Sequence, residues 1–419
     1  MLMKYGCIGE KLGHSFSPAL HAMFGNRAYE LLELTPAELP AFFRERAFLG
    51  VNVTIPYKEA VLPYLDEIDP VAAEIGAVNT VVCRDGRLYG YNTDFAGMKA
   101  LFLRAGIPVA GAHAAVLGGG GTSRTARAVL RALGARSVVR VSRRPGEPDE
   151  IGYDTLRARR GGISVLVNTT PVGMFPREDG MAADPADFPA LRGALDAVYN
   201  PLRSDFVLRA QAKGVPATGG LYMLAAQAAA AHTLFTGEAV PTEKLERVCR
   251  ALRDEKENIV LLGMPGAGKP TLGRLLAAAT GRPFFDSDRE VEEAAGAKIP
   301  DLFGKVGEAG FRAAESEAVA ALSVRTGAVI ATGGGVVLRE ENVRRLRRNG
   351  RLIFLDRPIE TITPTTGRPL SRDRAALRRL FAEREPLYRA AADLTLTVGE
   401  NERPEETLTR LLRLTKEEV

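Results

Sequence analysis

The sequence predicts an α/β fold with largely parallel strands, distributed over more than one domain. Three observations support this prediction. Short β-branched runs alternate with Ala-, Arg- and Leu-rich helical stretches between about residues 45 and 215. Two strand-like runs lead directly into a glycine-rich loop and then a helix, an order typical of nucleotide-binding α/β domains. A length of 419 residues is sufficient for roughly two to four domains.

The predicted strands fall into two groups along the chain. A charged stretch, 250–257, separates the groups and reads as the end of a helix plus a short linker. No repeat of roughly 20–50 residues is evident, so a solenoid is not expected. Strands are expected at 50–56, 79–83, 114–118, 137–142, 164–170 and 195–200, and in the second group at 258–263, 328–332 and 352–355.

Composition excludes several classes of protein. Apolar residues make up 46% and charged residues 26%, which excludes a disordered or fibrous chain. The net charge of +5 is too small for this length to indicate nucleic-acid binding, and it suits anionic small ligands. Cys7, Cys83 and Cys249 are widely spaced and predict neither a disulfide framework nor a zinc site. We therefore expect a cytoplasmic protein, and no segment predicts a membrane span.

The first glycine loop follows the predicted strand 114–118 and precedes a helix expected over Thr125–Leu133. Glycines allow a tight turn and let the backbone approach a pyrophosphate, which the helix N-terminus attracts. Ser123 stands where the usual fingerprint has its third glycine, so a flexible turn remains the alternative from this segment alone. The candidate cofactor-binding residues of this loop are Gly118, Gly120 and Gly121.

Two arginines follow the next predicted strand, which ends in Ser142-Arg143-Arg144 about twenty residues beyond the loop. An NAD site carries Asp or Glu at this place, whereas arginines favour a 2′-phosphate and hence NADP(H). Arg124 is expected to close the same pocket from the other side. The alternative for each arginine is a solvated surface charge.

The second glycine loop, residues 258–271, has the spacing of a P-loop, whose amides cradle phosphates while its lysine reaches the β- and γ-oxygens of ATP. Pro270 stands where Ser or Thr would coordinate Mg²⁺. The candidate nucleotide-binding residues are Gly263, Gly266, Gly268, Lys269 and Thr271.

Clusters of hydroxyls, amides, one lysine and one aspartate surround the first loop, as suits a small polyhydroxylated acid. Taken in order, these blocks resemble shikimate dehydrogenase over essentially residues 1–250. The blocks are GEKLGHSFSP (9–18), GVNVTIPYK (50–58), GAVNT (76–80), NTD (92–94), NTTPVGM (168–174), DAVYNP (196–201) and GLYMLAAQ (220–227).

The resemblance implies NADPH-dependent reduction of 3-dehydroshikimate to shikimate. It makes Lys58 and Asp94 the catalytic pair, because an ammonium held by a carboxylate can donate a proton and stabilise developing negative charge. Alone, the two residues would read as a solvated lysine and a helix cap. His14 is interpreted as structural, and Ser204 replaces the family's threonine but keeps its hydroxyl. The implied substrate contacts are Ser15, Ser17, Thr54, Asn79, Tyr199 and Gln227.

A second ordered set of motifs resembles shikimate kinase over about residues 258–419: FDSD (285–288), FGKVGEAGFRAAE (303–315), ATGGG (331–335), GRPL (367–370) and REPLY (384–388). The resemblance implies that Asp286 lies near Mg²⁺ and the attacking hydroxyl, and that Arg368 clamps the transferring phosphate. Singly, the aspartates could be helix caps and the glycines a turn. The implied shikimate contacts are Asp288, Arg312, Gly333, Gly334, Gly335 and Arg384.

The sequence therefore predicts a Rossmann-like NADP domain with an α/β substrate domain, followed by a P-loop α/β kinase domain that uses ATP and Mg²⁺. One alternative is an active dehydrogenase whose kinase-like part binds ligand but is weakly active or inactive because of Pro270. Another is a quinate oxidoreductase. The basic run 344–348 is expected to be a solvated helix face. The domains are expected at 1–100 with 218–250 (substrate), 101–217 (NADP), 251–257 (linker) and 258–419 (kinase-like).

Overall fold

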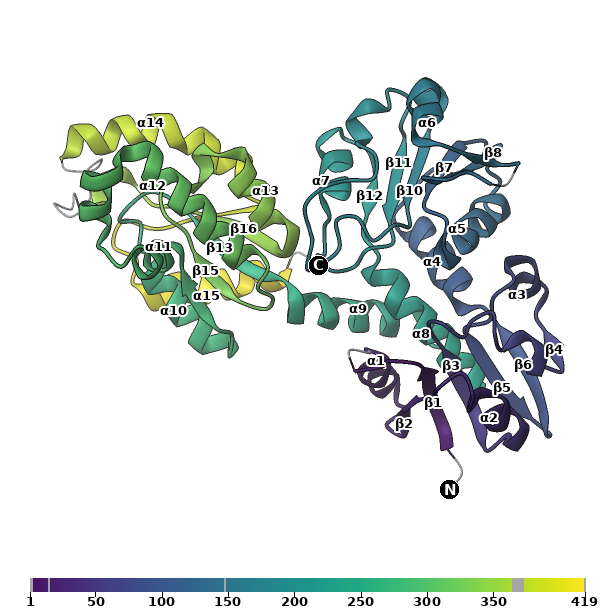
Figure 1. Cartoon of the computed structure of the whole chain (residues 1–419). Coiled ribbons are helices and arrows are strands. Elements are labelled where there is room, and N and C mark those ends of the chain that lie inside the picture. Colours follow the sequence, from purple (N-terminus) through teal and green to yellow (C-terminus); the bar gives the residue numbers. More distant parts are fainter. Residues whose placement is uncertain (1–2, 14–15, 147, 364–372, 418–419) are drawn as a thin grey trace. The chain divides into compact units, whose positions relative to one another are not determined.

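The computed structural model describes residues 3–13, 16–146, 148–363 and 373–417. The chain divides into two compact units, Met1–Ala251 (unit 1) and Leu252–Val419 (unit 2), which are coloured purple to teal and green to yellow in Figure 1. Unit 1 contains two six-stranded sheets, and unit 2 contains one five-stranded sheet. The predicted α/β fold is confirmed.

The first sheet has the strand order β2-β1-β3-β5-β6-β4 and is mixed. Strand β1 pairs in parallel with β2 and β3, and β4 pairs in parallel with β6, whereas β5 is antiparallel to both β3 and β6. The expectation of largely parallel strands therefore holds only in part in this sheet. A tight hairpin at Asp85-Gly86, where both residues have positive φ, makes β5 and β6 antiparallel. The strands are β1 (Met3–Gly9), β2 (Tyr29–Glu33), β3 (Phe48–Val53), β4 (Glu67–Ile68), β5 (Thr80–Arg84) and β6 (Arg87–Tyr91), with helices α1 (Ser17–Phe24), α2 (Leu39–Glu45) and α3 (Pro70–Ile75).

The second sheet is parallel throughout, with the order β12-β11-β10-β7-β8-β9. The strand order reverses between β7 and β10, as in a doubly wound nucleotide-binding fold. Helix α5 begins at Gly121 rather than at Thr125, because the end of the glycine loop is already helical. The elements are β7 (His113–Leu117), α5 (Gly121–Ala132), β8 (Ser137–Val141), β9 (Glu150–Ile151), α6 (Tyr153–Arg159), β10 (Val165–Asn168), β11 (Gly193–Asp196), α7 (Asp205–Ala212) and β12 (Ala217–Thr218).

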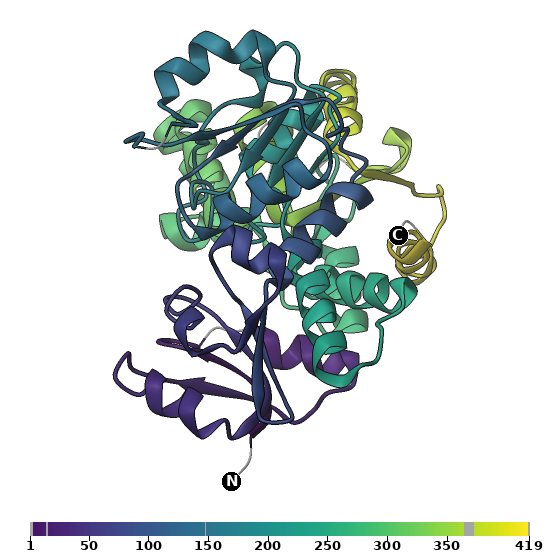
Figure 2. The same ribbon diagram turned by 90° about the vertical axis from the view of Figure 1, so that its right-hand side faces the viewer.

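Two helices connect the sheets of unit 1: the chain leaves the first sheet through α4 (Thr93–Arg104) and returns through α8 (Leu221–Thr236) (Figure 2). The two helices pack against each other, α8 also contacts β3 and β5, and α4 contacts α5. Their approach is very close at Gly97, where a Cβ would lie 2.7 Å from the carbonyl oxygen of Met223. Helix α9 (Thr242–Lys256) follows, and Arg104 of α4 donates to both oxygens of Glu246 at 2.7 and 3.0 Å.

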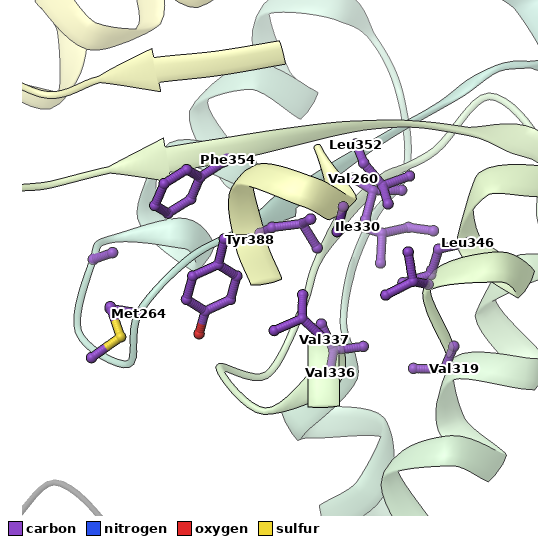
Figure 3. Packing of buried hydrophobic residues seen from close by; sticks show 14 of the residues in the cluster. Val260, Met264, Val319, Ile330, Val336, Val337, Leu346, Leu352, Phe354 and Tyr388 are labelled. Atoms are coloured by element: carbon purple, nitrogen blue, oxygen red, sulfur yellow. The ribbon is translucent and has the colours of Figure 1, made fainter. Parts of the chain in front are cut away.

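Unit 2 has a parallel sheet in the order β14-β15-β13-β16-β17. Its strands are buried on both faces: Val260 and Phe354 face one hydrophobic cluster, Ile259 and Ile353 another. Figure 3 shows the first cluster, in which Tyr388 stacks on Phe354. The elements are β13 (Asn258–Leu262), α10 (Lys269–Thr280), β14 (Phe284–Asp286), α11 (Ser287–Ala295), α12 (Ile299–Ser323), β15 (Val329–Ala331), α13 (Glu340–Asn349), β16 (Gly350–Asp356), α14 (Arg374–Ala391), β17 (Leu394–Thr397) and α15 (Pro404–Glu417).

The basic run on α13 is not the solvated face that the sequence predicts. Arg347 donates to the carbonyl oxygens of Ala390 and Ala391 at 2.8 and 2.9 Å and so caps the last turn of α14. Arg348 is buried, with 3% of its surface exposed. The run is therefore largely committed to packing within unit 2. Among the residues that the structure describes, no helix is long and apolar enough to cross a membrane.

We expect Gly97→Ala to destabilise unit 1, although alanine normally stabilises a helix interior by about 1 kcal/mol relative to glycine. The added Cβ would overlap the backbone of α8 at Met223, and backbone cannot turn aside as a side chain can. Thermal unfolding should show a melting temperature several degrees lower. The matched control is Gly304→Ala, at an exposed helical position where a Cβ meets nothing within 4 Å, and this variant should be neutral or slightly stabilised. Equal behaviour of the two variants would contradict the close crossing.

Candidate active sites in the two units

A cavity of about 480 Å³ lies in unit 1 and collects most of the predicted substrate contacts. The predicted substrate contacts in the cavity come from five separate segments of the chain, so only the tertiary fold brings them together. Ser15 and His14 lie outside the described residues. The predicted residues that line the cavity are Ser17, Thr54, Lys58, Asn79, Asp94, Tyr199 and Gln227.

Lys58 and Asp94 form an ion pair in this cavity, with 2.6 Å between Nζ and Oδ2. Lys58 follows β3, and Asp94 lies in the first turn of α4, where the helix N-terminus stabilises a carboxylate. Asn92 fixes that turn, because its side chain accepts from the Phe95 amide at 3.2 Å and donates to the Ala77 carbonyl at 2.9 Å. The two charged side chains remain 31% and 21% exposed, so a ligand can reach them.

Buried amides beneath the cavity hold the binding residues in place. Asn79 Oδ1 accepts from the Thr93 amide at 2.7 Å. Asn52 accepts from the Tyr29 hydroxyl at 2.7 Å and donates to Thr80 Oγ1 at 3.0 Å. Asn52 lies in the block 50–58, but its contacts leave no local pattern in the sequence, because Tyr29 and Thr80 are 23 and 28 residues away from it.

The first glycine loop lies beside this cavity, because its Thr122 is among the lining residues. Gly118 has a φ of +116°, which requires glycine, and Gly120 is the extended residue that precedes α5. A Cβ at Gly120 or Gly121 would meet no atom within 4 Å, so no other part of the protein crowds the start of α5 on this side. The donor set of amides at the start of α5 fits a pyrophosphate.

The arginines predicted to recognise a 2′-phosphate differ in their surroundings. Arg143 and Arg144 are exposed at the end of β8, and the Ser142 amide donates to the carbonyl of Ile151 at 3.0 Å. Arg124 instead forms an ion pair with Glu59, the residue after Lys58. The pair therefore ties the first glycine loop to the segment that carries Lys58.

Asp196 is a buried carboxylate at the end of β11. It accepts hydrogen bonds from Asn168 Nδ2 at 2.9 Å, from the Val198 amide at 3.0 Å and from the Ser204 hydroxyl. The hydroxyl that Ser204 retains is thus used. Burial raises the pKa of Asp196 from its ordinary 3.8 to about 6, although these hydrogen bonds oppose the shift.

A larger cavity, about 810 Å³, lies in unit 2. Glu315 was missed as a site residue, although it lies three positions after Arg312 on one helix face and binds Arg312 Nη1 at 2.8 Å. Burial raises the pKa of Glu315, and the charge of Arg312 opposes that shift. The predicted residues that line this cavity are Asp286, Asp288, Arg312, Gly334, Gly335 and Arg384.

The triple-glycine segment after β15 passes very close to these side chains. A Cβ at Gly335 would lie 1.9 Å from Nη1 of Arg312, and one at Gly333 would lie 2.5 Å from Oδ1 of Asp288. Arg384 Nη1 donates to the Gly334 carbonyl at 3.0 Å. Only glycine permits this close packing of two arginines and an aspartate against the backbone.

The second glycine loop runs from β13 into α10. Gly263, Gly266 and Gly268 all have positive φ, between +84° and +144°. Lys269 Nζ donates to the carbonyl oxygens of Gly263 and Met264 at 2.6 and 2.9 Å. Thr271 is exposed in the first turn of the helix.

Pro270 is the second residue of α10, where a missing amide leaves no intrahelical hydrogen bond unmade. Asp286 caps α11 by accepting from the Asp288 amide at 3.0 Å, and it also lines the cavity of unit 2. Its carboxylate is a hard oxygen donor that suits Mg²⁺. Arg368 lies outside the described residues.

Comparison with known families matches both units. The family model described as "Shikimate dehydrogenase substrate binding domain" matches residues 7–81, and the one described as "Shikimate kinase" matches residues 265–416. A shikimate dehydrogenase (NADP(+)) of Moorella thermoacetica is 36% identical over 287 residues, covering 62% of this chain and 96% of the relative. The enzyme of that name from Thermus thermophilus is 40% identical over 269 residues, covering 59% and 98%.

Solved structures agree. A chorismate mutase/shikimate 5-dehydrogenase fusion protein from Clostridium acetobutylicum matches with a TM-score of 0.56 and 32% identity, over 61% of this chain and 98% of that one. Shikimate 5-dehydrogenase from Thermus thermophilus, in complex with NADP(H) and shikimate, matches with a TM-score of 0.53 and 35% identity, over 59% and 99%. Both resemblances stated from the sequence motifs are confirmed.

The raised pKa of Asp196 predicts a pH-dependent cost to stability. Between pH 3.8 and about 6 the folded protein holds a proton that the unfolded chain has lost, so stability falls as pH rises through this window. Asp196→Asn removes the titration. The melting temperature of the wild type minus that of Asp196→Asn should therefore decrease between pH 4 and pH 7, by an amount worth at most roughly 3 kcal/mol. Asp187→Asn, at an exposed position, corrects for general effects of pH. A difference that rises with pH would contradict the shift.

Proposed function

The chain belongs to the shikimate dehydrogenase family, and we propose on that premise that unit 1 reduces 3-dehydroshikimate to shikimate with NADPH. The observation that carries the proposal is the Lys58–Asp94 ion pair, 2.6 Å long, inside a cavity that also presents hydroxyl and amide side chains. Such a lining suits a small hydroxylated acid.

In this proposal, bound NADPH supplies the hydride, and the residues of unit 1 manage the proton. Lys58 Nζ donates a proton to the substrate oxygen as negative charge develops on it. Asp94 orients the ammonium and keeps it charged until transfer. Asn79 and Gln227 hold the substrate hydroxyls, and both are kept in place by contacts with Thr93.

The cofactor is expected to bind across the glycine loop, with Gly118, Gly120 and Gly121 at its pyrophosphate and Arg124, Ser142, Arg143 and Arg144 around the 2′-phosphate. The positive charge at the end of β8 supports NADPH over NADH. Comparing turnover of quinate and shikimate with NAD⁺ and NADP⁺ separates this proposal from a quinate oxidoreductase.

For unit 2 we infer phosphorylation of shikimate by MgATP at the 3-hydroxyl. The reduction proposed for unit 1 forms that hydroxyl group from a carbonyl group, so the two reactions would be consecutive. Asp288, Arg312, Arg384 and the glycines 333–335 would bind shikimate, and Lys269 with the loop amides would bind ATP. Asp286 would hold Mg²⁺ near the attacking hydroxyl, and Arg368 would act at the transferring phosphate.

A second candidate for unit 2, a ligand-binding module with weak or no phosphoryl transfer, is favoured by Pro270. The residue suits the first turn of α10 but supplies neither a hydroxyl for Mg²⁺ nor an amide for phosphate. Supplying the purified chain with 3-dehydroshikimate, NADPH and MgATP distinguishes the two candidates. Products that continue to shikimate 3-phosphate support the bifunctional enzyme, and products that stop at shikimate support the binding module.

Both units would act on small molecules in the cytoplasm, with no nucleic-acid or membrane partner. The proposed boundaries are a substrate domain at 1–100 and 218–250, an NADP domain at 101–217 and a kinase domain from 258.

We expect Lys58→Ala to lower the turnover number of the dehydrogenase by about 10²–10⁴-fold, the usual effect of a positioned proton donor. Asp94→Asn should act in the same direction. Steady-state kinetics and a separate titration with NADPH check this, because cofactor affinity should change little. Lys99→Ala, an exposed lysine on the same helix as Asp94, is the control. Near-normal turnover in Lys58→Ala would remove this residue from the mechanism.

We expect Pro270→Ser to raise MgATP-dependent phosphorylation of shikimate, because a serine hydroxyl can ligate Mg²⁺ and its amide can face the β-phosphate. Binding of ATP should improve less than turnover, since the substitution mainly repositions the γ-phosphoryl group. The dehydrogenase turnover of the same preparation is the internal control and should not change. Full kinase activity that is the same with proline and with serine would show that this position does not limit the reaction.

A further inference from the structure

We propose that Glu150 is a positioning residue for NADPH, because its carboxylate fixes the loop that carries Arg143 and Arg144. This inference rests on the proposed function, in which these arginines meet the 2′-phosphate. Glu150 itself begins β9, on the far side of the loop from the arginines. The sequence analysis did not single it out.

Both oxygens of the Glu150 carboxylate are engaged. Oε2 accepts from the amide of Gly146 at 2.6 Å, and Oε1 forms an ion pair with Nη2 of Arg140. The side chains of Arg140 and Glu150 are only 8% and 6% exposed. A buried charge pair of this kind is strongly disrupted when one partner is removed, since the other is left uncompensated.

The sheet already fixes both ends of the loop between β8 and β9, and Glu150 fixes its backbone at a further point. Strands β8 and β9 pair in parallel, with Arg140 opposite Glu150. The Ser142 amide donates to the Ile151 carbonyl at 3.0 Å, immediately before the two arginines. Glu150 then holds the backbone again at Gly146, immediately beyond them. The arginines thus lie between two anchored points four residues apart.

This anchoring matters because Arg143 and Arg144 are long, exposed side chains. Ordering such side chains and a mobile backbone on a ligand costs free energy, and a backbone fixed beforehand lowers that cost. The 2′-phosphate should benefit, whereas NADH makes no contact with these arginines that depends on charge.

The orientation of Glu150 has a second effect. A carboxylate free at this edge of the sheet would repel a 2′-phosphate, which is how NAD-specific sites exclude NADP. Arg140 and Gly146 instead hold the negative charge inside the protein, where Arg140 balances it. The neighbouring Asp149 is likewise neutralised, by ion pairs with Arg127 and Arg131 of α5. Among the described residues of the loop, the exposed charges are therefore those of Arg143 and Arg144.

The test uses two variants of the full-length chain that break the anchor in different ways. Glu150→Gln removes the charge of the carboxylate, and Gly146→Pro removes the donating amide while keeping the charges of both Glu150 and Arg140. Arg143→Ala serves as the reference for loss of phosphate recognition, and Asp154→Asn, whose side chain is 96% exposed, is the matched control. Fluorescence titration gives the Kd of NADPH and of NADH for each variant, and kcat and melting temperature are measured in parallel.

We expect Glu150→Gln and Gly146→Pro to raise the Kd of NADPH by about tenfold, the order of one lost charge-assisted contact, with little change for NADH and in kcat at saturating NADPH. If Glu150→Gln does not fold, the same selective loss in Gly146→Pro carries the inference. No change in either Kd, or equal loss for both cofactors, would overturn it.

Arg143→Ala distinguishes a failure of the role proposed for Glu150 from a failure of the cofactor assignment. A selective loss of NADPH in Arg143→Ala without one in the two anchor variants refutes the role of Glu150 and leaves the proposed function standing. Equal weakening of both cofactors in Arg143→Ala shows that the arginine does not read the phosphate, and then the cofactor assignment and the role of Glu150 fall together.

Discussion

Parallel strands end at the same edge of a sheet, and this constraint decides where chemistry is possible in both units. In unit 1 the glycine loop after β7 and the carboxylate at the end of β11 meet at that edge. In unit 2 the P-loop after β13, Asp286 after β14 and the three glycines after β15 do the same. Side chains then have only a short distance to span at each site, because the backbone already places there helix N-termini of the kind that suit a phosphate group.

Much of this arrangement could be predicted from the sequence, because glycine loops and strand runs are local signals. The ordered motifs led to Lys58 and Asp94, which the fold brings within 2.6 Å of each other. What could not be predicted were contacts between distant residues that no motif marks. Asn52 bonds across strands, and Arg348 is buried rather than solvated. The turn at Asp85-Gly86 differs from these contacts, because its dipeptide is a local hairpin signal that could be recognised in the sequence.

Pro270 satisfies the structural requirement of its position but not the chemical one. Its backbone suits the first turn of α10, whereas its side chain lacks the hydroxyl expected there. The backbone of α10 accepts proline in its second position without losing a hydrogen bond, so the P-loop keeps its shape and its positive-φ glycines. The metal ligand is a matter of side-chain atoms alone. A sequence that satisfies the structural requirements of a nucleotide loop can therefore still lack the hydroxyl that the motif normally supplies at this position.

The close crossing of α4 and α8 limits how the dehydrogenase pocket could be redesigned for larger substrates. Helix α4 carries Asp94 at its start and α8 carries Gln227, and Gly97 lies against both the backbone at Met223 and the Cβ of Gln227. Because the helices are already in backbone contact, they cannot be moved independently of the two functional side chains. Room for a bulkier ring must come from shorter side chains at the cavity wall, and the Lys58–Asp94 ion pair would keep its place while specificity changes around it.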